Sequence, residues 1–274
     1  PEHTTYTQSL NFDGEGIRVA VADTGLQAGT LLGTHPDLAG RAVAFFQYGN
    51  LVNAADQHGH GTHLAGIIAG TNHLAGADSE GNYFGLGIAP AAEIVTQRIF
   101  DGAGVFKATN FAALTRDAVL AGAYVGNNSW GADVQGRYDV NAWEFDALVR
   151  DANLQTPQDD PFVLIFSAGN SGPRSQAISS PGAAKNVITV GASQSSRAGF
   201  TTHNNGLDAM ASFSSRGPCE DGRTKPDLVA PGTWIASLRA LQGNPSSIRF
   251  PIDDDYVYMA VSYTHLTLPT NREV

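Results

Sequence analysis

The sequence predicts an α/β fold in which a mostly parallel central sheet is covered by helices on both faces. Short apolar runs of strand length alternate along the chain with segments whose apolar residues have helical spacing. Glycine is abundant, with 31 residues, and it clusters where the apolar runs end, as expected when strands lead into functional loops. A chain of 274 residues with 42% hydrophobic content can bury the core that one such domain needs.

The individual elements are predicted from the short apolar runs, which indicate strands, and from the helical spacing of apolar residues, which indicates helices. Two segments are predicted to be helices: 108–123 carries apolar residues at positions 111, 114, 118 and 121, and a later amphipathic helix is marked by Val140, Trp143, Ala147 and Leu148. The predicted buried strands are 17–22, 94–99, 124–127, 162–167 and 187–190.

Charge and composition narrow the classes of function. The formal net charge of −10 argues against binding to nucleic acid or to an anionic membrane, because both need a surplus of Lys and Arg. A single cysteine, Cys219, excludes an internal disulfide and any zinc site built only from cysteines. The longest apolar runs are too short to cross a bilayer. We therefore expect no nucleic-acid partner and no membrane partner.

Chemically useful side chains follow three of the predicted strands. Asp23 comes after the first strand in VADTGL, Ser129 after the third, and Asn170 after the fourth in FSAGNSGP. The carboxyl ends of parallel strands meet at one edge of a sheet, so these residues should share a rim. His60, in HGHGTHLAG, opens a small apolar segment that is expected to be a buried helix, where its imidazole can act as a general base. The Asn170 amide can donate to a developing oxyanion.

Other interpretations of these residues remain open. Asp23 can simply cap a turn, and Asn170 can occupy a left-handed turn. His58, His60 and His63 can hold a metal, although their spacing is not the i, i+4 pair of a helical zinc site. His63 is also expected to be a packed structural histidine.

Together these motifs resemble the subtilisin-like serine proteases, or subtilases. Asp before His before Ser is the chain order of that family. The wording is closest to the alkaline, oxidation-tolerant subtilases, and the resemblance implies their three-layer fold. It runs from about residue 14 to 259 and includes NNSWGA at 127–132, SPGAAKNVITVGA at 180–192, FSSRGP at 213–218 and KPDLVAPGTWIAS at 225–237.

The resemblance implies a serine endopeptidase of broad specificity that works through an acyl-enzyme. Asp23 would orient the base, His60 would be the base, and Asn170 would be the oxyanion donor. An edge segment would pair with extended substrate, a mode in which main-chain hydrogen bonds provide affinity. The implied substrate-binding residues are Ser129, Trp130 and Gly131 on one pocket wall, Ser167, Ala168 and Gly169 on the other, and Gly102, Ala103 and Gly104 along the edge.

The family also sets expectations about partners and metals. Protein or peptide substrates, a cleaved propeptide and secretion to the outside of the cell are implied. Catalysis needs no cofactor, whereas a structural calcium ion is common in the family. The acidic run 253–255 lacks a spaced loop pattern and is expected to be solvated surface.

The sequence departs from the family at the nucleophile. Subtilases carry Gly-Thr-Ser-Met-Ala at this point, but aligning Tyr258 and Met259 with the preceding residues places Tyr263 at the nucleophile position and Ser262 one residue early. Pro269 would interrupt the helix that normally follows. We therefore expect a catalytic domain over 1–259 that lacks its C-terminal portion, and a non-family tail over 260–274.

Three hypotheses follow from that departure. The first is a serine endopeptidase impaired at its nucleophile, with Ser262 as the candidate and a poor one. The second is a catalytically silent fold that binds peptides. The third is a metal hydrolase that uses His58, His60 and His63 and would lose activity with chelators.

Overall fold

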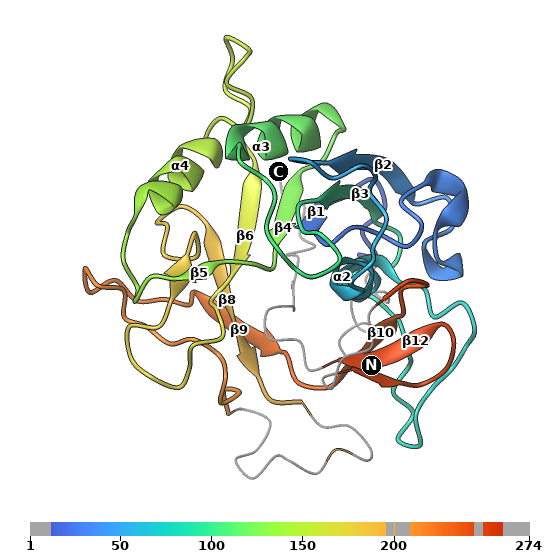
Figure 1. Ribbon diagram of the computed structural model, residues 1–274. Coiled ribbons are helices and arrows are strands. Elements are labelled where there is room, and N and C mark those ends of the chain that lie inside the picture. The colour runs from blue at the N-terminus through green and yellow to red at the C-terminus, as the bar shows by residue number, and fades with distance from the viewer. Residues whose placement is uncertain (1–11, 196–199, 201–208, 244–248, 260–274) are drawn as a thin grey trace.

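The computed structural model of the chain describes residues 12–195, 200, 209–243 and 249–259. Its centre is a seven-stranded sheet with the order β2-β3-β1-β4-β6-β8-β9, in which every neighbouring pair is parallel (Figure 1). The strands are β1 Arg18–Asp23, β2 Ala42–Gln47, β3 Glu93–Arg98, β4 Val125–Asn128, β6 Val163–Ser167, β8 Ile188–Ser193 and β9 Leu228–Pro231. The predicted α/β fold with a mostly parallel sheet is confirmed.

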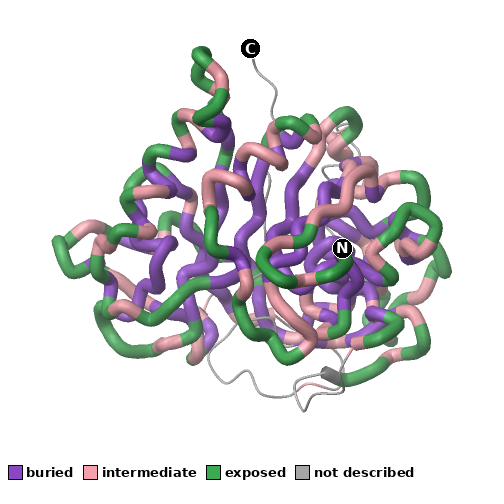
Figure 2. Tube along the Cα trace, turned by 45° about the horizontal axis from the view of Figure 1, so that its top comes forward, coloured by how far each residue is buried: buried purple, intermediate pink, exposed green. Residues whose placement is uncertain are grey.

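Helices cover both faces of the sheet. Strand β1 shows why, because Val19 and Val21 pack in one core with helix α2 (His60–Ala69), whereas Ala20 and Ala22 pack in another with α3 (Phe111–Leu120) and α4 (Val140–Leu148). Alternate residues of a strand point to opposite faces, so a run that is buried throughout needs a helix on each side. Figure 2 shows the buried residues following these strands, while exposed residues gather on the outer loops.

Helix α4 lies where the sequence predicts a helix, but the predicted apolar face is wrong. Val140 and Trp143 are 70% and 62% exposed, and Ala147 is also exposed. The buried face is instead formed by Ala142, Phe145 and Leu148. These three residues also have helical spacing, and the aromatic ring of Phe145 packs against Phe166 of β6 with ring centroids 4.8 Å apart.

Smaller elements complete the described chain. Strand β10 (Ile235–Leu238) forms an antiparallel sheet with β11 (Arg249–Pro251) and β12 (Tyr256–Met259), and this sheet packs on α2. A Cβ added at Gly66 would lie 2.3 Å from Ser237 Oγ, so glycine is needed where α2 meets β10. The other short elements are the 3₁₀ helices η1 (Leu31–Gly33) and η2 (Pro36–Leu38) and the strand pair β5 (Ala132–Asp133) and β7 (Ser179–Ser180).

No helix in the described residues is both long enough and apolar enough to span a membrane.

Candidate active site

Asp23 and His60 form a hydrogen-bonded pair at the carboxyl end of β1. His60 Nδ1 lies 2.8 Å from Asp23 Oδ1, and the same carboxylate oxygen accepts the backbone N–H of Thr24 at 2.8 Å. Asp23 is only 1% exposed, whereas the His60 side chain reaches the cleft. With Asp23 as the acceptor, Nδ1 carries the proton and Nε2 is the nitrogen that can take one up.

Close backbone contact brings the two residues together. Gly25, two residues after Asp23, has a φ of +111°, and Gly59, directly before His60, has a φ of +101°; both lie in the left-handed region that favours glycine. A Cβ at Gly61 would lie 2.3 Å from the carbonyl oxygen of Gly25. The first turn of α2 can therefore abut the turn after β1 only because these positions are glycines.

Asp56 is a buried carboxylate that organises the start of α2. Its Oδ1 accepts hydrogen bonds from the N–H groups of His58 (3.0 Å) and Gly59 (2.6 Å) and from Thr24 Oγ1 (2.9 Å), and its Oδ2 accepts from Thr62 N–H (2.8 Å). A carboxylate at a helix N-terminus satisfies unpaired N–H groups and is favoured by the helix dipole. Asp56 was not among the residues predicted from sequence, although its place four residues before the helix start indicates a role at the helix N-terminus.

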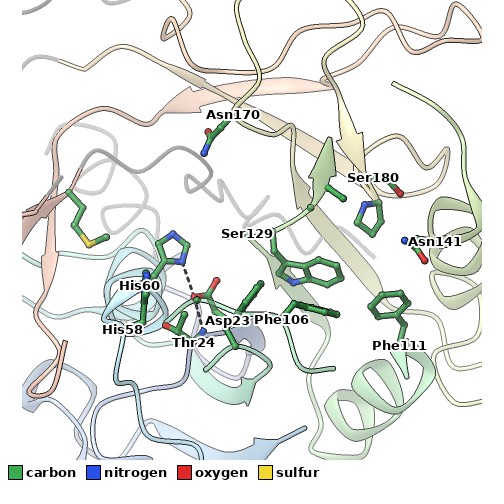
Figure 3. A pocket seen from close by; sticks show the side chains of 17 residues that line it. Asp23, Thr24, His58, His60, Phe106, Phe111, Ser129, Asn141, Asn170 and Ser180 are labelled. Atoms are coloured by element: carbon green, nitrogen blue, oxygen red, sulfur yellow. Dashed lines mark hydrogen bonds and ion pairs between the residues drawn. The ribbon is translucent and has the colours of Figure 1, made fainter. Parts of the chain in front are cut away.

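The pair opens on a cleft of about 560 Å³, a size typical of ligand sites. Figure 3 shows His60 and Asn170 at one end, with Phe111 and Asn141 at the other. Asp23 and Asn170, expected to share a rim because each follows a strand, line this cleft together with His60, which opens α2. The lining residues used below are Asp23, His60, Asn170, Met259, Phe100, Gly104, Phe106, Phe111, Ser129, Trp130, Gly131, Asn141, Ser180 and Pro181.

Aromatic rings make up much of the far end of the cleft. The Trp130 ring lies 5.3 Å from that of Phe106 and 5.6 Å from that of Phe111, measured between centroids. Trp130 was expected to line the pocket; Phe106 and Phe111 were not. Three phenylalanines follow the strand that ends at Arg98 within 13 residues, and this clustering could have indicated an aromatic wall. Their contact with Trp130, however, depends on the fold and cannot be seen in the sequence.

The expected pocket walls are only partly those of the structure. Ser129, Trp130 and Gly131 line the cleft, but Ser167, Ala168 and Gly169 are not among its described lining residues. The carbonyl of Ala168 accepts the Ser179 N–H at 2.9 Å. This bond joins the segment to β7, whose Ser180 lines the cleft together with the following Pro181.

The expected substrate edge is a turn. Gly104 lines the cleft, whereas Gly102 and Ala103 do not appear among the described lining residues. Asp101 holds the turn together, because its Oδ1 accepts the Ala103 N–H at 3.0 Å and its carbonyl accepts the Gly104 N–H at 3.0 Å. The N–H of Val105 and other donors lower the pKa of Asp101. The N–H groups of Ala103 and Gly104 are thus bonded within the turn, although this segment was expected to pair with substrate through its main chain. Ser262 lies outside the described residues.

The three histidines do not point to a common centre. His63 is buried, and its Nε2 lies 3.0 Å from the carbonyl of Ile235, as expected of a structural histidine. His60 pairs with Asp23, and the His58 ring centroid is 6.4 Å from that of His60. In the part of the chain that the structure describes, no three His, Cys, Asp or Glu side chains are grouped as metal ligands.

Comparison with known proteins identifies the family to which the chain belongs. The sequence pattern of the Subtilase family matches residues 14–259, which is most of the chain. The chain belongs to the subtilase family. It is 37% identical over 238 residues to the serine protease AprX of Bacillus subtilis (strain 168) and 32% identical over 200 residues to subtilisin Savinase of Lederbergia lenta.

The chain spans about half of the length of AprX and less than two thirds of that of Savinase. The alignments span 83% and 72% of this subtilase but only 48% of AprX and 64% of Savinase. Among solved structures, Sphericase matches with a TM-score of 0.61 at 23% identity, covering 90% of this chain and 72% of its own. A cold-adapted subtilisin-like serine proteinase matches with a TM-score of 0.57 at 25% identity, covering 92% and 71%. The Sphericase match concerns the fold alone.

Proposed function

We propose that this subtilase is a serine endopeptidase that cleaves peptide bonds of proteins through an acyl-enzyme. The observation that carries the proposal is the 2.8 Å contact between His60 Nδ1 and Asp23 Oδ1 at the mouth of a cleft that Asn170 also lines. Family membership supports the same activity.

Each residue has a defined task in this reaction. A serine oxygen attacks the substrate carbonyl carbon while its proton passes to His60 Nε2, and the buried Asp23 carboxylate stabilises the imidazolium that forms. The Asn170 side-chain amide donates to the oxyanion, a contribution worth about 10²–10³ in turnover for such a donor. His60 then gives the proton to the leaving amine, and water hydrolyses the ester with His60 again as the base.

Substrate residues further upstream of the one at the scissile bond would occupy the aromatic end of the cleft. The rings of Phe106, Phe111 and Trp130 offer apolar contact there, and Asn141 adds a polar group. Apolar walls with few polar groups discriminate weakly between side chains of similar size. This lining supports broad specificity toward proteins and peptides.

The nucleophile is the weakest part of the proposed site. Met259 at the end of β12 lines the cleft, so the described chain reaches the site directly before the segment that departs from the family motif. We propose Ser262 as a poor nucleophile, because it stands one residue before the family position, which Tyr263 occupies. A slip of one residue turns a side chain by about 100° on a helix and to the opposite face on a strand. That departure also favours a second function, peptide binding without cleavage.

The test is turnover of a chromogenic peptide together with fluorophosphonate labelling and mass spectrometry. We expect weak turnover, little change in Ser262→Ala, and a gain when Val261→Gly, Ser262→Thr and Tyr263→Ser together restore the Gly-Thr-Ser part of the motif. Ser79→Ala, at an exposed serine, is the control. A large loss in Ser262→Ala would show that the register is wrong. Binding of the peptide without turnover or labelling, even in the restored variant, would favour the silent peptide-binding fold.

Further proposals rest on the family resemblance alone. We propose secretion, removal of a propeptide, and a calcium ion that stabilises the fold without taking part in catalysis. No group of three or more His, Cys, Asp or Glu side chains in the described residues marks a site for it, so no residues are assigned. The acidic run 253–255 forms a turn in which Asp253 Oδ1 accepts the N–H groups of Asp255 and Tyr256 at 2.8 and 2.7 Å.

A further inference from the structure

Arg98 is a buried cation beside the catalytic pair that the mechanism does not use. It ends β3, stands opposite Asp23 in the register with β1, and is 3% exposed. Its Nη1 donates to Asn53 Oδ1 (2.8 Å) and the Asn53 carbonyl (3.3 Å), its Nη2 donates to Gln57 Oε1 (2.9 Å), and its Nε donates to the Phe100 carbonyl (3.1 Å). A guanidinium presents its donors in a rigid fork, so these contacts fix the relative positions of the groups that accept them.

Those acceptors belong to two segments that border the cleft. Asn53 and Gln57 flank Asp56 in the loop that leads into His60. Phe100 begins the turn that contributes Phe100, Gly104 and Phe106 to the cleft wall. The two segments are also packed together, since a Cβ at Gly102 would lie 3.1 Å from Gln57 Cβ.

The electrostatic surroundings favour a charged Arg98. Burial lowers the pKa of the Arg98 guanidinium, and the carboxylates of Asp56 and Asp101 oppose that effect. These two carboxylates are the ones that organise the loop before His60 and the turn after Phe100. The cation therefore interacts electrostatically with an anionic centre in each of the segments it joins.

We propose that Arg98 is a positioning residue for substrate binding, which fixes the cleft wall at Phe100–Phe106 relative to the loop that leads into His60. Arg98 does not touch substrate; it acts through the Phe100 carbonyl and through Asn53 and Gln57. The proposal rests on the proposed function and deepens it. It assigns to Arg98 the discrimination between extended peptides, which reach the aromatic wall, and short substrates, which occupy only the His60 and Asn170 end.

The test compares Arg98→Lys with the parent chain on two substrates, a tetrapeptide anilide and a single-residue ester. Lysine keeps the charge but cannot span both segments. We expect the ratio of kcat/KM for the tetrapeptide to kcat/KM for the ester to fall about 10-fold, since small misplacements of binding groups cost up to about 10²-fold. Arg18→Lys, the same change at the amino end of β1, should keep the parent ratio; there Arg18 pairs with Glu93 at 2.6 Å.

Hydrogen exchange of the same variants gives a readout that does not need activity. In Arg98→Lys we expect faster exchange in 53–58 and 100–106, with the core strands unchanged. An unchanged ratio, or equal losses on both substrates, would overturn the proposal. If the parent chain turns over neither substrate, the proposed activity fails, and exchange alone decides on Arg98: a rise in both segments supports its role, and its absence overturns it.

Discussion

At the scale of single residues, the position of His60 depends on the carboxylate of Asp56. Asp56 is not among the described residues that line the cleft. Asp56 accepts the N–H groups of His58, Gly59 and Thr62, and it accepts the hydroxyl of Thr24, the residue that follows Asp23. Thr24 Oγ1 in turn accepts the Gly61 N–H at 2.8 Å. The base and its orienting carboxylate are thus held by one network on both sides.

Asp56→Asn should lower kcat about 10- to 100-fold and change KM little. The amide group introduced by this substitution would face a backbone N–H donor where the carboxylate now accepts, so the first turn of α2 would shift and misplace His60. The measurement is kcat and KM on a peptide anilide, with thermal unfolding to confirm that the variant is folded. Asp221→Asn, at an exposed aspartate that pairs with Arg223, serves as the control. A parent-like kcat in folded Asp56→Asn would refute the positioning role.

The residues that sequence could locate are those attached to the ends of recognisable strands. Asp23, Ser129 and Asn170 follow apolar runs, and parallel topology then predicts their convergence. Asp56 follows no predicted strand, and Arg98, although it ends β3, acts through acceptors that lie far away in the chain. Thr24 is 32 residues from Asp56, and Asn53 is 45 residues from Arg98.

At the scale of elements, η2 is tied to the hairpin that brings Met259 to the cleft. His35 Nδ1 accepts the Asp37 N–H at 3.2 Å, and its Nε2 lies 3.1 Å from the carbonyl of Asp255. Tyr256 Oη donates to Asp37 Oδ1 at 3.0 Å. These contacts need a neutral His35, since Nδ1 must keep its lone pair to accept.

Stability should therefore fall as pH drops through the titration of unfolded His35. Burial lowers the pKa of His35 from 6.5, against the opposing charges of Asp37, Asp255 and Asp253. Below about pH 6.5, His35 binds a proton in the unfolded chain but not in the native state. The stability that neutral His35 contributes is therefore complete above about pH 6.5 and is lost as the pH falls toward the lower pKa of the native state.

Urea unfolding of the parent and of His35→Gln at pH 8, 7, 6 and 5 measures this effect. We expect the free energy of unfolding of the parent to fall more steeply between pH 7 and 5 than that of His35→Gln. His73→Gln, at an exposed histidine, should keep the parent slope. Equal slopes for the parent and His35→Gln would contradict the account.

The elements themselves were predictable where periodicity is strong. The strands predicted at 17–22, 94–99 and 162–167 correspond to β1, β3 and β6, shifted by at most one residue at either end. Strand β2 was missed, and the face of α4 was misassigned. In α4 two overlapping apolar stripes share Leu148, and the one containing Phe145 is buried because that ring meets Phe166 and Trp130. Tertiary packing made that choice.

At the scale of the whole molecule, strand order explains why one site is assembled from distant segments. Strands β3, β1, β4 and β6 are consecutive neighbours, so Arg98, Asp23, Ser129 and Asn170 all lie at or directly after adjacent carboxyl ends of the sheet. Helix α2 adds His60 from one face, and α3 and α4 add Phe111 and Asn141 from the other. The central claim is that this assembly performs metal-independent general-base catalysis through His60.

The most direct test is hydrolysis of a chromogenic peptide by the parent chain and by His60→Ala, each with and without EDTA. We expect His60→Ala to lower turnover by about 10²-fold or more, because a positioned general base contributes that much. Parent turnover should survive EDTA while the chain stays folded. Unchanged turnover in His60→Ala would contradict the claim, as would rapid loss in EDTA that zinc reverses in a still-folded protein.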